Sequence, residues 1–325
     1  MTPAPPGRRC WGESDEGYTI EIDPTLRARV EAVCAAAGLD ARGARLLKFT
    51  NNAVFELPND RAVVRIAGSR AMHRRTEKVV TVARWLAGHD FPAVRLMPAV
   101  AQPVAAGDDL ATVWEAVPAV SAPPTVGDIG VLLSRFHALP QAAALPRFDP
   151  VEDVRWRLDH AAGVAGIPAN NGEHSAVLTA DDLAFLRARC DAVEDQLADV
   201  DWILPPGPIH GDAQRGNLIP GPAGPVMCDF DSTCIGPREW DLIPILFGVQ
   251  RLADPPDNAA NLAAAYGVDL TSWAGFDVLM RVRELKLVTS VVPVLSVNPK
   301  VRREFRRRLH SLRTGDRSTT WQRYT

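Results

Sequence analysis

The chain has 325 residues, of which 46% are hydrophobic and 23% are charged, and its formal net charge is -3 at pH 7. These proportions are ordinary for a soluble globular protein, and the length leaves room for two domains or lobes with sizeable cores. The small net charge gives no overall reason to expect binding to nucleic acid.

The first segment, residues 1–17, is rich in proline, glycine and charged residues. It lacks the apolar run of a signal peptide, and no stretch of the chain has the roughly 18 apolar residues that a membrane span needs. We therefore expect a flexible tail on a cytoplasmic protein that does not contact membranes. The five cysteines form no Cys-x-x-Cys pair, which favours reduced thiols that serve in packing.

The next hundred residues alternate short apolar runs with one longer helical pattern. A helix is expected from Asp23-Pro24 to Gly38, because a capping residue precedes a proline and a glycine follows the apolar stripe. β-Branched and aromatic residues predict strands, and one stretch between them has helical spacing. The strands are expected at 45–49, 54–57, 61–67, 94–96, 102–105 and 110–117, with the helix at about 71–88. Residues 18–120 are thus predicted to form an α+β lobe on an antiparallel sheet.

Residues 121–325 are expected to form a larger and mainly helical lobe. Ser121-Ala122-Pro123-Pro124 marks the boundary, and Thr179-Ala180-Asp181-Asp182 resembles a capping box with Asp in place of Glu. A long loop is expected at 163–178. Helices are expected at about 129–136, 151–162, 179–197, 240–252, 258–265, 276–295 and 301–312.

The stretch with most chemical information is Ile209-His210-Gly211-Asp212-Ala213-Gln214-Arg215-Gly216-Asn217, followed by Met227-Cys228-Asp229-Phe230-Asp231. Between them, two short apolar runs surround a turn rich in proline and glycine, which predicts a hairpin that returns Asp229 to Asn217. A carboxylate and an amide oxygen brought together suit a hard cation such as Mg2+. A further aspartate, Asp212, could orient or deprotonate an attacking hydroxyl. Together these are the parts of a phosphoryl-transfer centre.

His-Gly-Asp-x-x-x-x-Asn followed by Asp-Phe-Asp resembles the aminoglycoside phosphotransferase and choline kinase branch of the protein-kinase-like superfamily. The resemblance covers residues 40–290 and implies a two-lobed kinase-like fold. It also implies transfer of a phosphoryl group from ATP, with GTP not excluded, to a hydroxyl of a small molecule. Asp212 would be catalytic, and Asn217 and Asp229 would bind Mg2+.

The same resemblance assigns the nucleotide to the small lobe, with departures from the family pattern. Asn52 belongs to the turn at 50–53, which takes the place of a glycine-rich loop but contains no glycine. Arg65 stands where kinases have a lysine, and Glu77 on the next helix would hold it in place. The backbone of Glu115 and Val117 would face adenine. Solvent-exposed charges, and a core strand at 110–117, are the alternatives to these roles.

Two features favour a small acceptor over a protein. Only a few residues separate Asp231 from Glu239-Trp240-Asp241-Leu242, which leaves no room for a long activation segment, and Gln214 replaces the lysine common in protein kinases. The resemblance also implies four residues on the acceptor side or in support of the site: His210, Asp231, Asp241 and Glu284. A simple helix N-cap is the alternative for Asp241.

Two other functions remain open. The altered turn at 50–53 would also fit a pseudokinase-like protein that binds nucleotide with little catalysis. The basic run Arg302-Arg303-Glu304-Phe305-Arg306-Arg307-Arg308 would fit a nucleic-acid-binding helix, although a solvated helix face is the simpler reading. Neither a phosphate-loop nor a dinucleotide-binding glycine motif occurs in the sequence. The sequence does not indicate an oligomeric state.

Overall fold

The computed structural model describes residues 22–49, 52–69, 72–118, 120, 122–140, 145–161, 178–296 and 298–324. The chain divides into two compact units. Unit 1 comprises Met1–Pro146 and Pro208–Ile235, and unit 2 comprises Arg147–Gly207 and Gly236–Thr325. The tail expected at 1–17 and nearly all of the loop expected at 163–178 lie outside the described residues.

Unit 1 begins with helix α1, Pro24–Ala37, whose two ends agree with the sequence signals. The Asp23 carboxylate accepts the backbone N–H of Thr25 at 2.8 Å and that of Leu26 at 3.3 Å. Gly38 closes the helix with a left-handed backbone (φ 71°), a conformation that glycine adopts without steric cost.

A five-stranded antiparallel sheet follows, in the order β1-β2-β3-β5-β4. Its strands are β1 (Arg45–Phe49), β2 (Asn52–Leu57), β3 (Ala62–Ala67), β4 (Val104–Ala106) and β5 (Asp109–Glu115). The strand expected at 94–96 is wrong. That segment divides its backbone hydrogen bonds between two partners, because Val94 N–H donates to Met227 and Met97 N–H to Val113. Only isolated bridges therefore form there.

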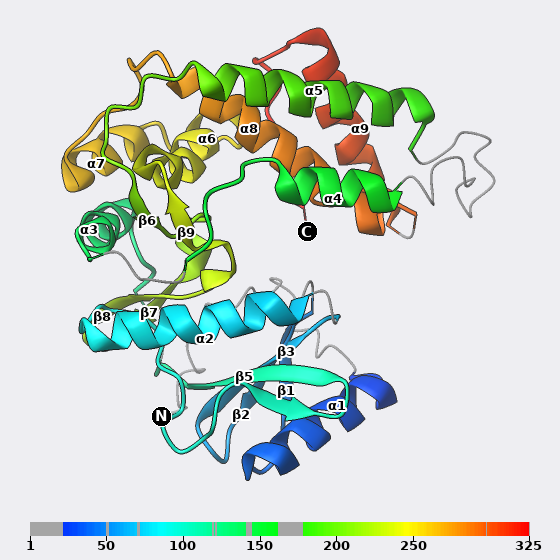
Figure 1. Ribbon diagram of the computed structural model, residues 1–325, viewed down its shortest axis with the longest axis vertical. Helices are drawn as coiled ribbons and strands as arrows, with labels where there is room; N and C mark the ends of the chain where they lie inside the picture. Colours follow the sequence, from blue (N-terminus) through cyan, green and yellow to red (C-terminus); the bar gives the residue numbers. More distant parts are fainter. Residues whose placement is uncertain are drawn as a thin grey trace, which may run out of the picture. The chain divides into compact units, whose positions relative to one another are not determined.

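The alternation of side chains along β3 decides which face of the sheet carries Arg65. Val64 and Ile66 are fully buried and pack in one core with α1. Arg65 points to the opposite face, where Val54 and Thr112 are its partners on the neighbouring strands. Helix α2, His73–Gly88, lies on that opposite face (Figure 1).

The rest of unit 1 contains helix α3 (Val126–His137), the paired strands β6 (Gly207–Ile209) and β9 (Cys234–Gly236), and the hairpin of β7 (Leu218–Gly221) with β8 (Gly224–Met227). This hairpin was expected from the sequence. It joins the segment that follows α2 through two backbone hydrogen bonds, Met227 N–H to Pro92 at 2.9 Å and Val94 N–H to Met227 at 3.0 Å.

Unit 2 is helical in its described residues. Its α-helices are α4 (Glu152–Ala161), α5 (Ala180–Ala198), α6 (Ile243–Arg251), α7 (Asp257–Tyr266), α8 (Phe276–Thr289) and α9 (Pro299–Thr314). The capping box predicted at Thr179 and Asp182 is formed. The single helix expected at 276–295 is wrong, because α8 ends at Thr289 and a short 3-10 turn, Val292–Val294, follows. Pro293 lies in that turn and lacks the N–H that would continue an α-helix.

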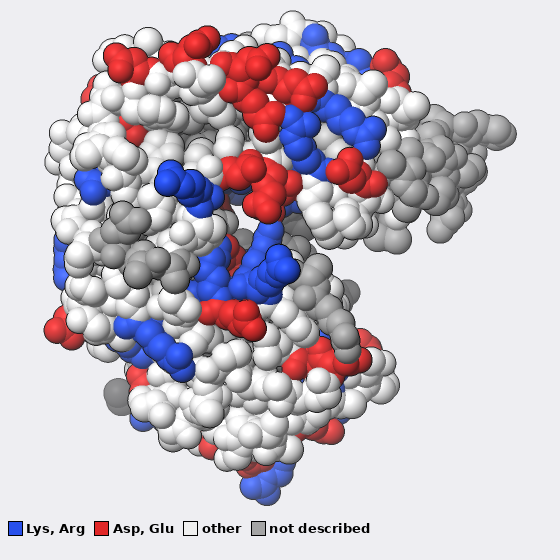
Figure 2. Space-filling view, in the orientation of Figure 1, with Lys and Arg blue, Asp and Glu red and all other residues white. Residues whose placement is uncertain are grey.

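Acidic and basic side chains lie next to one another over the face shown in Figure 2, in keeping with the small net charge. None of the described helices is both long enough and apolar enough to span a membrane. The four described cysteines, Cys34, Cys190, Cys228 and Cys234, are free and buried, as expected for thiols used in packing.

Candidate active site

The loop at 210–217, which carries Asp212 and Asn217, begins with a turn that only glycine can form. Gly211 has φ 83°, and a Cβ atom at this position would lie 2.2 Å from the backbone oxygen of Ser232. The chain that carries Asp212 therefore passes in direct contact with the chain that follows Asp229. This close approach explains the glycine between His210 and Asp212.

His210 connects the same loop to the end of the hairpin through hydrogen bonds. Its imidazole is fully buried, with Nε2 3.0 Å from the carbonyl oxygen of Cys228 and Nδ1 3.3 Å from the backbone N of Asp212. A carbonyl can only accept, so Nε2–H is the donor and Nδ1 accepts the N–H of Asp212. This pattern requires the neutral imidazole. The geometry gives His210 a supporting part, because it positions the backbone at Asp212.

Asn217 links the two halves of the motif. Its side-chain Nδ2 donates to the backbone oxygen of Asp212 at 2.7 Å, and the backbone carbonyl oxygen of Asn217 accepts the N–H of Cys228 at 2.9 Å. The first bond fixes the orientation of the amide group and turns Oδ1 away from Asp212. The predicted return of Asp229 to the neighbourhood of Asn217 is thus present in the structure.

Asp229 has the unusual backbone of this site. It adopts a left-handed conformation (φ 66°, ψ 66°), which is uncommon for residues other than glycine and is concentrated at functional sites. Loss of water around the carboxylate and the nearby charge of Asp231 raise the pKa of Asp229 above its usual value, while Arg65 opposes the rise. The anion is therefore disfavoured at this position, and a bound cation would restore it.

Arg65 lies beside both carboxylates of the Asp-Phe-Asp sequence. It forms an ion pair with Asp231 and lies 3.8 Å from Asp229 Oδ1. Two further side chains converge on Asp231. The amide of Asn52 donates to its carboxylate at 3.4 Å, and Lys78 from α2 donates to its backbone oxygen.

All five sequence candidates for the nucleotide remain predictions: Asn52, Arg65, Glu77, Glu115 and Val117. Glu77 is exposed on α2, and the carboxylates found beside Arg65 are those of Asp231 and Asp229. Glu115 ends β5 and Val117 follows it, and both residues belong to unit 1.

The two remaining candidates, Asp241 and Glu284, lie in unit 2 and are buried there. Glu284 forms an ion pair with Arg251 at 2.9 Å. Asp241 lies inside a 3-10 turn, Arg238–Leu242, whose N-cap is Pro237, so the alternative of a helix N-cap is wrong. Glu239, in the same turn, accepts the backbone N–H groups of Ile203 and Leu204 at 2.8 and 2.7 Å.

Sequence reasoning missed three contributors to the site. Lys78 contacts the backbone of Asp231, Gln214 donates to Asp212 Oδ2 at 3.2 Å, and the charge of Lys48 lowers the pKa of Asp229. No role was assigned to Lys78 from the sequence. Its position one residue after Glu77, on the helix expected to face Arg65, was the available signal.

The donor set fits a magnesium ion bound together with phosphate. No group of three or more His, Cys, Asp or Glu side chains placed to hold a metal ion occurs among the described residues. Mg2+ does not need such a group, because it commonly uses one or two protein oxygens and completes its shell with phosphates and water. Asp229 and the Oδ1 atom of Asn217 can supply those two oxygens.

One protein family matches most of this chain. The sequence pattern of the phosphotransferase enzyme family matches residues 47–278. No curated protein sequence matches the chain.

Solved structures share the fold at low sequence identity. An amicoumacin kinase in complex with AMP-PNP, Ca2+ and Ami aligns with TM-score 0.67 and 14% identity over 92% of this chain and 96% of its own. A choline kinase from Streptococcus pneumoniae aligns with TM-score 0.59 and 13% identity over 89% of this chain and 99% of its own. A spectinomycin phosphotransferase in complex with ADP and spectinomycin aligns with TM-score 0.56 and 15% identity over 88% and 93%.

These matches confirm the kinase-like α+β fold and the phosphotransferase class expected from the sequence. The family match spans most of the chain and contains the whole of the His-Gly-Asp and Asp-Phe-Asp region. The chain belongs to the phosphotransferase enzyme family.

Proposed function

We propose that this protein is a small-molecule kinase, which transfers the γ-phosphoryl group of ATP to a hydroxyl group with the help of Mg2+. The observation that carries the proposal is the cross-linked pair of loops around the β7–β8 hairpin. They hold Asp212, Asn217 and Asp229 in one unit, through the 2.7 Å bond from Asn217 to the backbone of Asp212.

Asn217 and Asp229 are the proposed magnesium ligands, and Arg65 is the proposed phosphate contact. When bound, Mg2+ neutralises phosphate charge and orients the γ-phosphoryl group. A guanidinium can donate two parallel hydrogen bonds to phosphate oxygens, and Arg65 is already beside the metal ligand Asp229. The amicoumacin kinase, solved with AMP-PNP and Ca2+, is a fold neighbour that was crystallised with both kinds of ligand.

Asp212 is the proposed partner of the acceptor hydroxyl. The hydroxyl oxygen forms a bond to the γ-phosphorus, the bond from that phosphorus to the β–γ bridging oxygen breaks, and ADP leaves. The hydroxyl proton passes to the Asp212 carboxylate. His210 and Gln214 restrict the position of this carboxylate, the first through the backbone and the second through a 3.2 Å bond to Oδ2.

Adenine recognition is assigned to the backbone of Glu115 and Val117. The N–H of Glu115 donates to the carbonyl oxygen of Arg95 at 2.9 Å, and the N–H of Ala116 donates to the carbonyl oxygen of Arg61 at 2.8 Å. Within the described part of the chain, the N–H of Val117 has no recorded partner. Its N–H is therefore the proposed donor to the base. This mode of recognition does not separate ATP from every other purine nucleotide, so GTP belongs in the assay.

The acceptor is proposed to be neutral or singly charged. A polycationic aminoglycoside would need several available carboxylates, and three acidic side chains are already engaged. Asp231 pairs with Arg65, Glu239 accepts two backbone N–H groups, and Glu284 pairs with Arg251. Hydroxylated antibiotics with few charges, and amino alcohols, fit better. Two of the fold neighbours are named for acceptors of these classes, namely the spectinomycin phosphotransferase and the choline kinase.

A phosphate-transfer screen tests the proposal directly. The protein is incubated with Mg2+ and ATP or GTP and with spectinomycin, amicoumacin, choline, ethanolamine and polycationic aminoglycosides, and products are detected as a phosphoryl mass shift. We expect turnover with a neutral or singly charged acceptor and a loss of about a hundredfold or more in Asp212→Asn. Asp201→Asn, an exposed residue elsewhere, is the matched control and should retain full turnover.

The alternative is a protein that binds nucleotide with little catalysis, and the replacement of the strand lysine by Arg65 favours it. That alternative predicts metal-dependent nucleotide binding without a phosphorylated product from any acceptor class. Turnover of polycationic aminoglycosides alone would contradict the proposed acceptor class, but it would still support the proposed kinase activity.

A further inference from the structure

The basic run on α9 does not form one continuous solvated face. Arg302 and Arg308 are buried, and Arg306 forms an ion pair with Asp182 at 2.6 Å. The exposed cations of this helix segment are Lys300, Arg303 and Arg307, which share one side of α9 because they are spaced by three and four residues.

The last described residues of the chain pack along α9. Trp321 is buried, and its indole N–H donates to Ser311 Oγ at 3.1 Å. The backbone N–H of Gln322 donates to Glu304 at 2.8 Å, and Arg323 pairs with Asp254 at 2.8 Å. These bonds hold the segment 321–324 in a fixed position against the helix.

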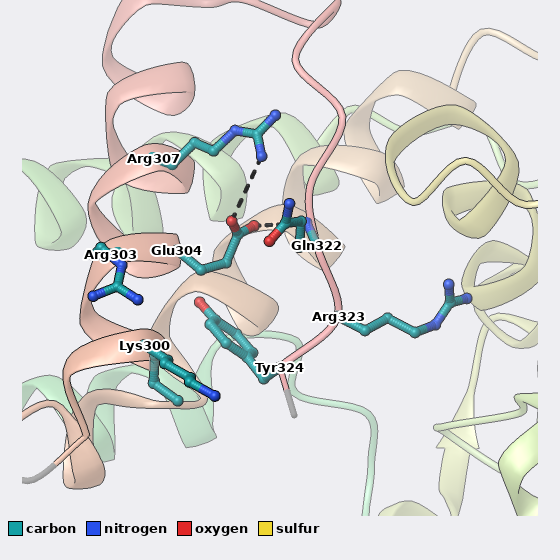
Figure 3. Close-up of a pocket in the computed structure, with 8 residues that line it drawn as sticks. Lys300, Arg303, Glu304, Arg307, Gln322, Arg323 and Tyr324 are labelled. Carbon is teal, nitrogen blue, oxygen red and sulfur yellow. Dashed lines mark hydrogen bonds and ion pairs between the residues drawn. The ribbon is translucent and has the colours of Figure 1, made fainter. Parts of the chain in front are cut away.

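A cavity of about 320 Å³ lies between α9 and this segment. Figure 3 shows the ring of Tyr324 facing the helix residues Lys300, Arg303 and Glu304, with Arg323 extending away from them. The lining residues are Lys300, Val301, Arg303, Glu304, Arg307, Gln322, Arg323 and Tyr324. This volume lies at the lower end of the range of small-molecule sites.

The cavity has an excess of positive charge. Its acidic residue, Glu304, is already paired with Arg308 at 2.9 Å and lies 3.8 Å from Arg307. The side chains of Lys300 and Arg303 have no ion pair or hydrogen bond with the described part of the chain. Two cations on one wall of the cavity are thus available to an anion.

Tyr324 adds a hydrogen-bond donor. Its hydroxyl oxygen is inaccessible to solvent and has no hydrogen-bond partner among the described residues. Burial raises the pKa of Tyr324 to about 12, so the hydroxyl keeps its proton at neutral pH. The guanidinium of Arg308 stacks 3.7 Å from the centre of the ring and fixes its position. A buried donor without an acceptor is unfavourable, and an anion in the cavity would supply one.

We propose that this cavity in unit 2 is a binding site for a small phosphate-bearing anion. Lys300 and Arg303 provide its charge partners, Tyr324 donates a hydrogen bond to a phosphate oxygen, and Val301 contacts the organic part. Ammonium, guanidinium and hydroxyl groups are the donors that proteins use for phosphate. The site is built from residues other than those of the proposed kinase centre, so it goes beyond the proposed function.

The test is a calorimetric titration with inorganic pyrophosphate in low-salt buffer that contains EDTA, which prevents metal-dependent binding at the kinase centre. We expect saturable binding by the full-length protein. Lys300→Ala/Arg303→Ala should weaken it at least about tenfold, and Tyr324→Phe about three- to tenfold, as expected for two charge partners and one hydrogen bond. Arg27→Ala/Arg147→Ala removes the same charge from exposed arginines elsewhere and should leave binding unchanged. Thermal melts of all four proteins check folding.

Four results would overturn the proposal. The first is an absence of saturation by the wild type, and the second is an equal loss in the control pair. The third is loss of binding in Arg65→Ala with full binding in Lys300→Ala/Arg303→Ala, which would assign pyrophosphate to the kinase centre. The fourth is saturable binding of a single-stranded oligonucleotide that depends on Lys300 and Arg303, together with no saturable binding of pyrophosphate. That result would make this a nucleic-acid surface.

Discussion

Two clusters of charged side chains, one in each unit, differ in how their charges are balanced. In unit 1, Arg65 is shared by two carboxylates, Asp229 and Asp231, and the charge of Asp212 raises the pKa of Asp229 as well. The backbone of Asp229 is left-handed in addition.

In unit 2, by contrast, two buried arginines, Arg251 and Arg308, each lie against a carboxylate. Arg251 pairs with Glu284 and Arg308 with Glu304, both at 2.9 Å. Both guanidinium groups also stack on Trp321, at 4.6 and 5.0 Å from the ring. Each of these two guanidinium groups thus has a carboxylate and an aromatic ring beside it.

The difference distinguishes a candidate ligand-binding site from a cluster with a structural role. A balanced and buried set of charges holds helices together, and it contributes nothing that a substrate could use. A set in which two carboxylates share one guanidinium, with a strained backbone at one of them, is unfavourable in isolation, and a bound divalent cation would relieve it. Each prediction below alters one side of this comparison.

The largest effect is expected from breaking the balanced cluster. Glu284→Ala leaves Arg251 buried without its partner and should lower the free energy of unfolding by about 3–5 kcal/mol. The exposed pair of Asp277 with Arg317 provides the matched control, because Asp277→Ala should cost about 1 kcal/mol or less. Chemical denaturation measures both. Equal losses would show that the buried cluster has no special part in stability.

A somewhat smaller effect is expected at the turn that brings the loop at 210–217 to Ser232. Gly211→Ala combines a positive φ with a contact of 2.2 Å to a backbone oxygen, and it should cost about 2–4 kcal/mol of unfolding free energy. Gly216→Ala lies in the same loop with no atom within 4 Å of the added methyl group, and should change stability by about 1 kcal/mol or less. A wild-type melting curve for Gly211→Ala would contradict the geometry of this turn.

Removing the shared cation should weaken nucleotide binding. Arg65→Ala is expected to reduce the affinity for Mg-ATP about tenfold, and Arg65→Lys should recover part of the loss, because the charge survives without the planar fork. Arg74→Ala, an exposed arginine on α2, is the control. Unchanged affinity in Arg65→Ala would show that Arg65 does not contribute to nucleotide binding and serves only in its ion pairs.

The smallest effect concerns the unbalanced carboxylates and depends on pH. Because the folded state raises the pKa of Asp229, it binds this proton more tightly than the unfolded chain, so the associated stability is present at low pH and is lost as pH rises through the raised pKa. Without metal at neutral pH, Asp229→Asn should therefore melt about one to three degrees higher than wild type. The difference should shrink in acid. A lower melting temperature for Asp229→Asn would show that the carboxylate stabilises the fold.

The sequence was most informative where the chemistry is local. Asp212 and Asn217 are separated by one short loop, and the turn after Ile219 returns the chain to Asp229, so the spacing alone predicts the geometry. The caps of α1 and the antiparallel strands follow from equally local patterns.

Contacts between distant segments could not be predicted in this way. The contacts of Lys78 and Asn52 with Asp231 span more than 150 residues, and nothing in the local pattern of α2 or β2 marks them. The pairing of Arg251 with Glu284 was missed for the same reason, and Glu284 was assigned to the acceptor instead. A single proline, Pro293, ends a helical pattern that otherwise continues.

The most direct test of the central claim is a calorimetric titration of wild type, Asp229→Asn and Asp212→Asn with ATP, in the presence and absence of Mg2+. If Asp229 binds the metal and Asp212 serves the acceptor, Mg2+ should strengthen nucleotide binding in wild type and in Asp212→Asn, and this gain should be lost in Asp229→Asn. Loss of the Mg2+-dependent gain in both variants, or in neither, would contradict the division of roles between the two aspartates.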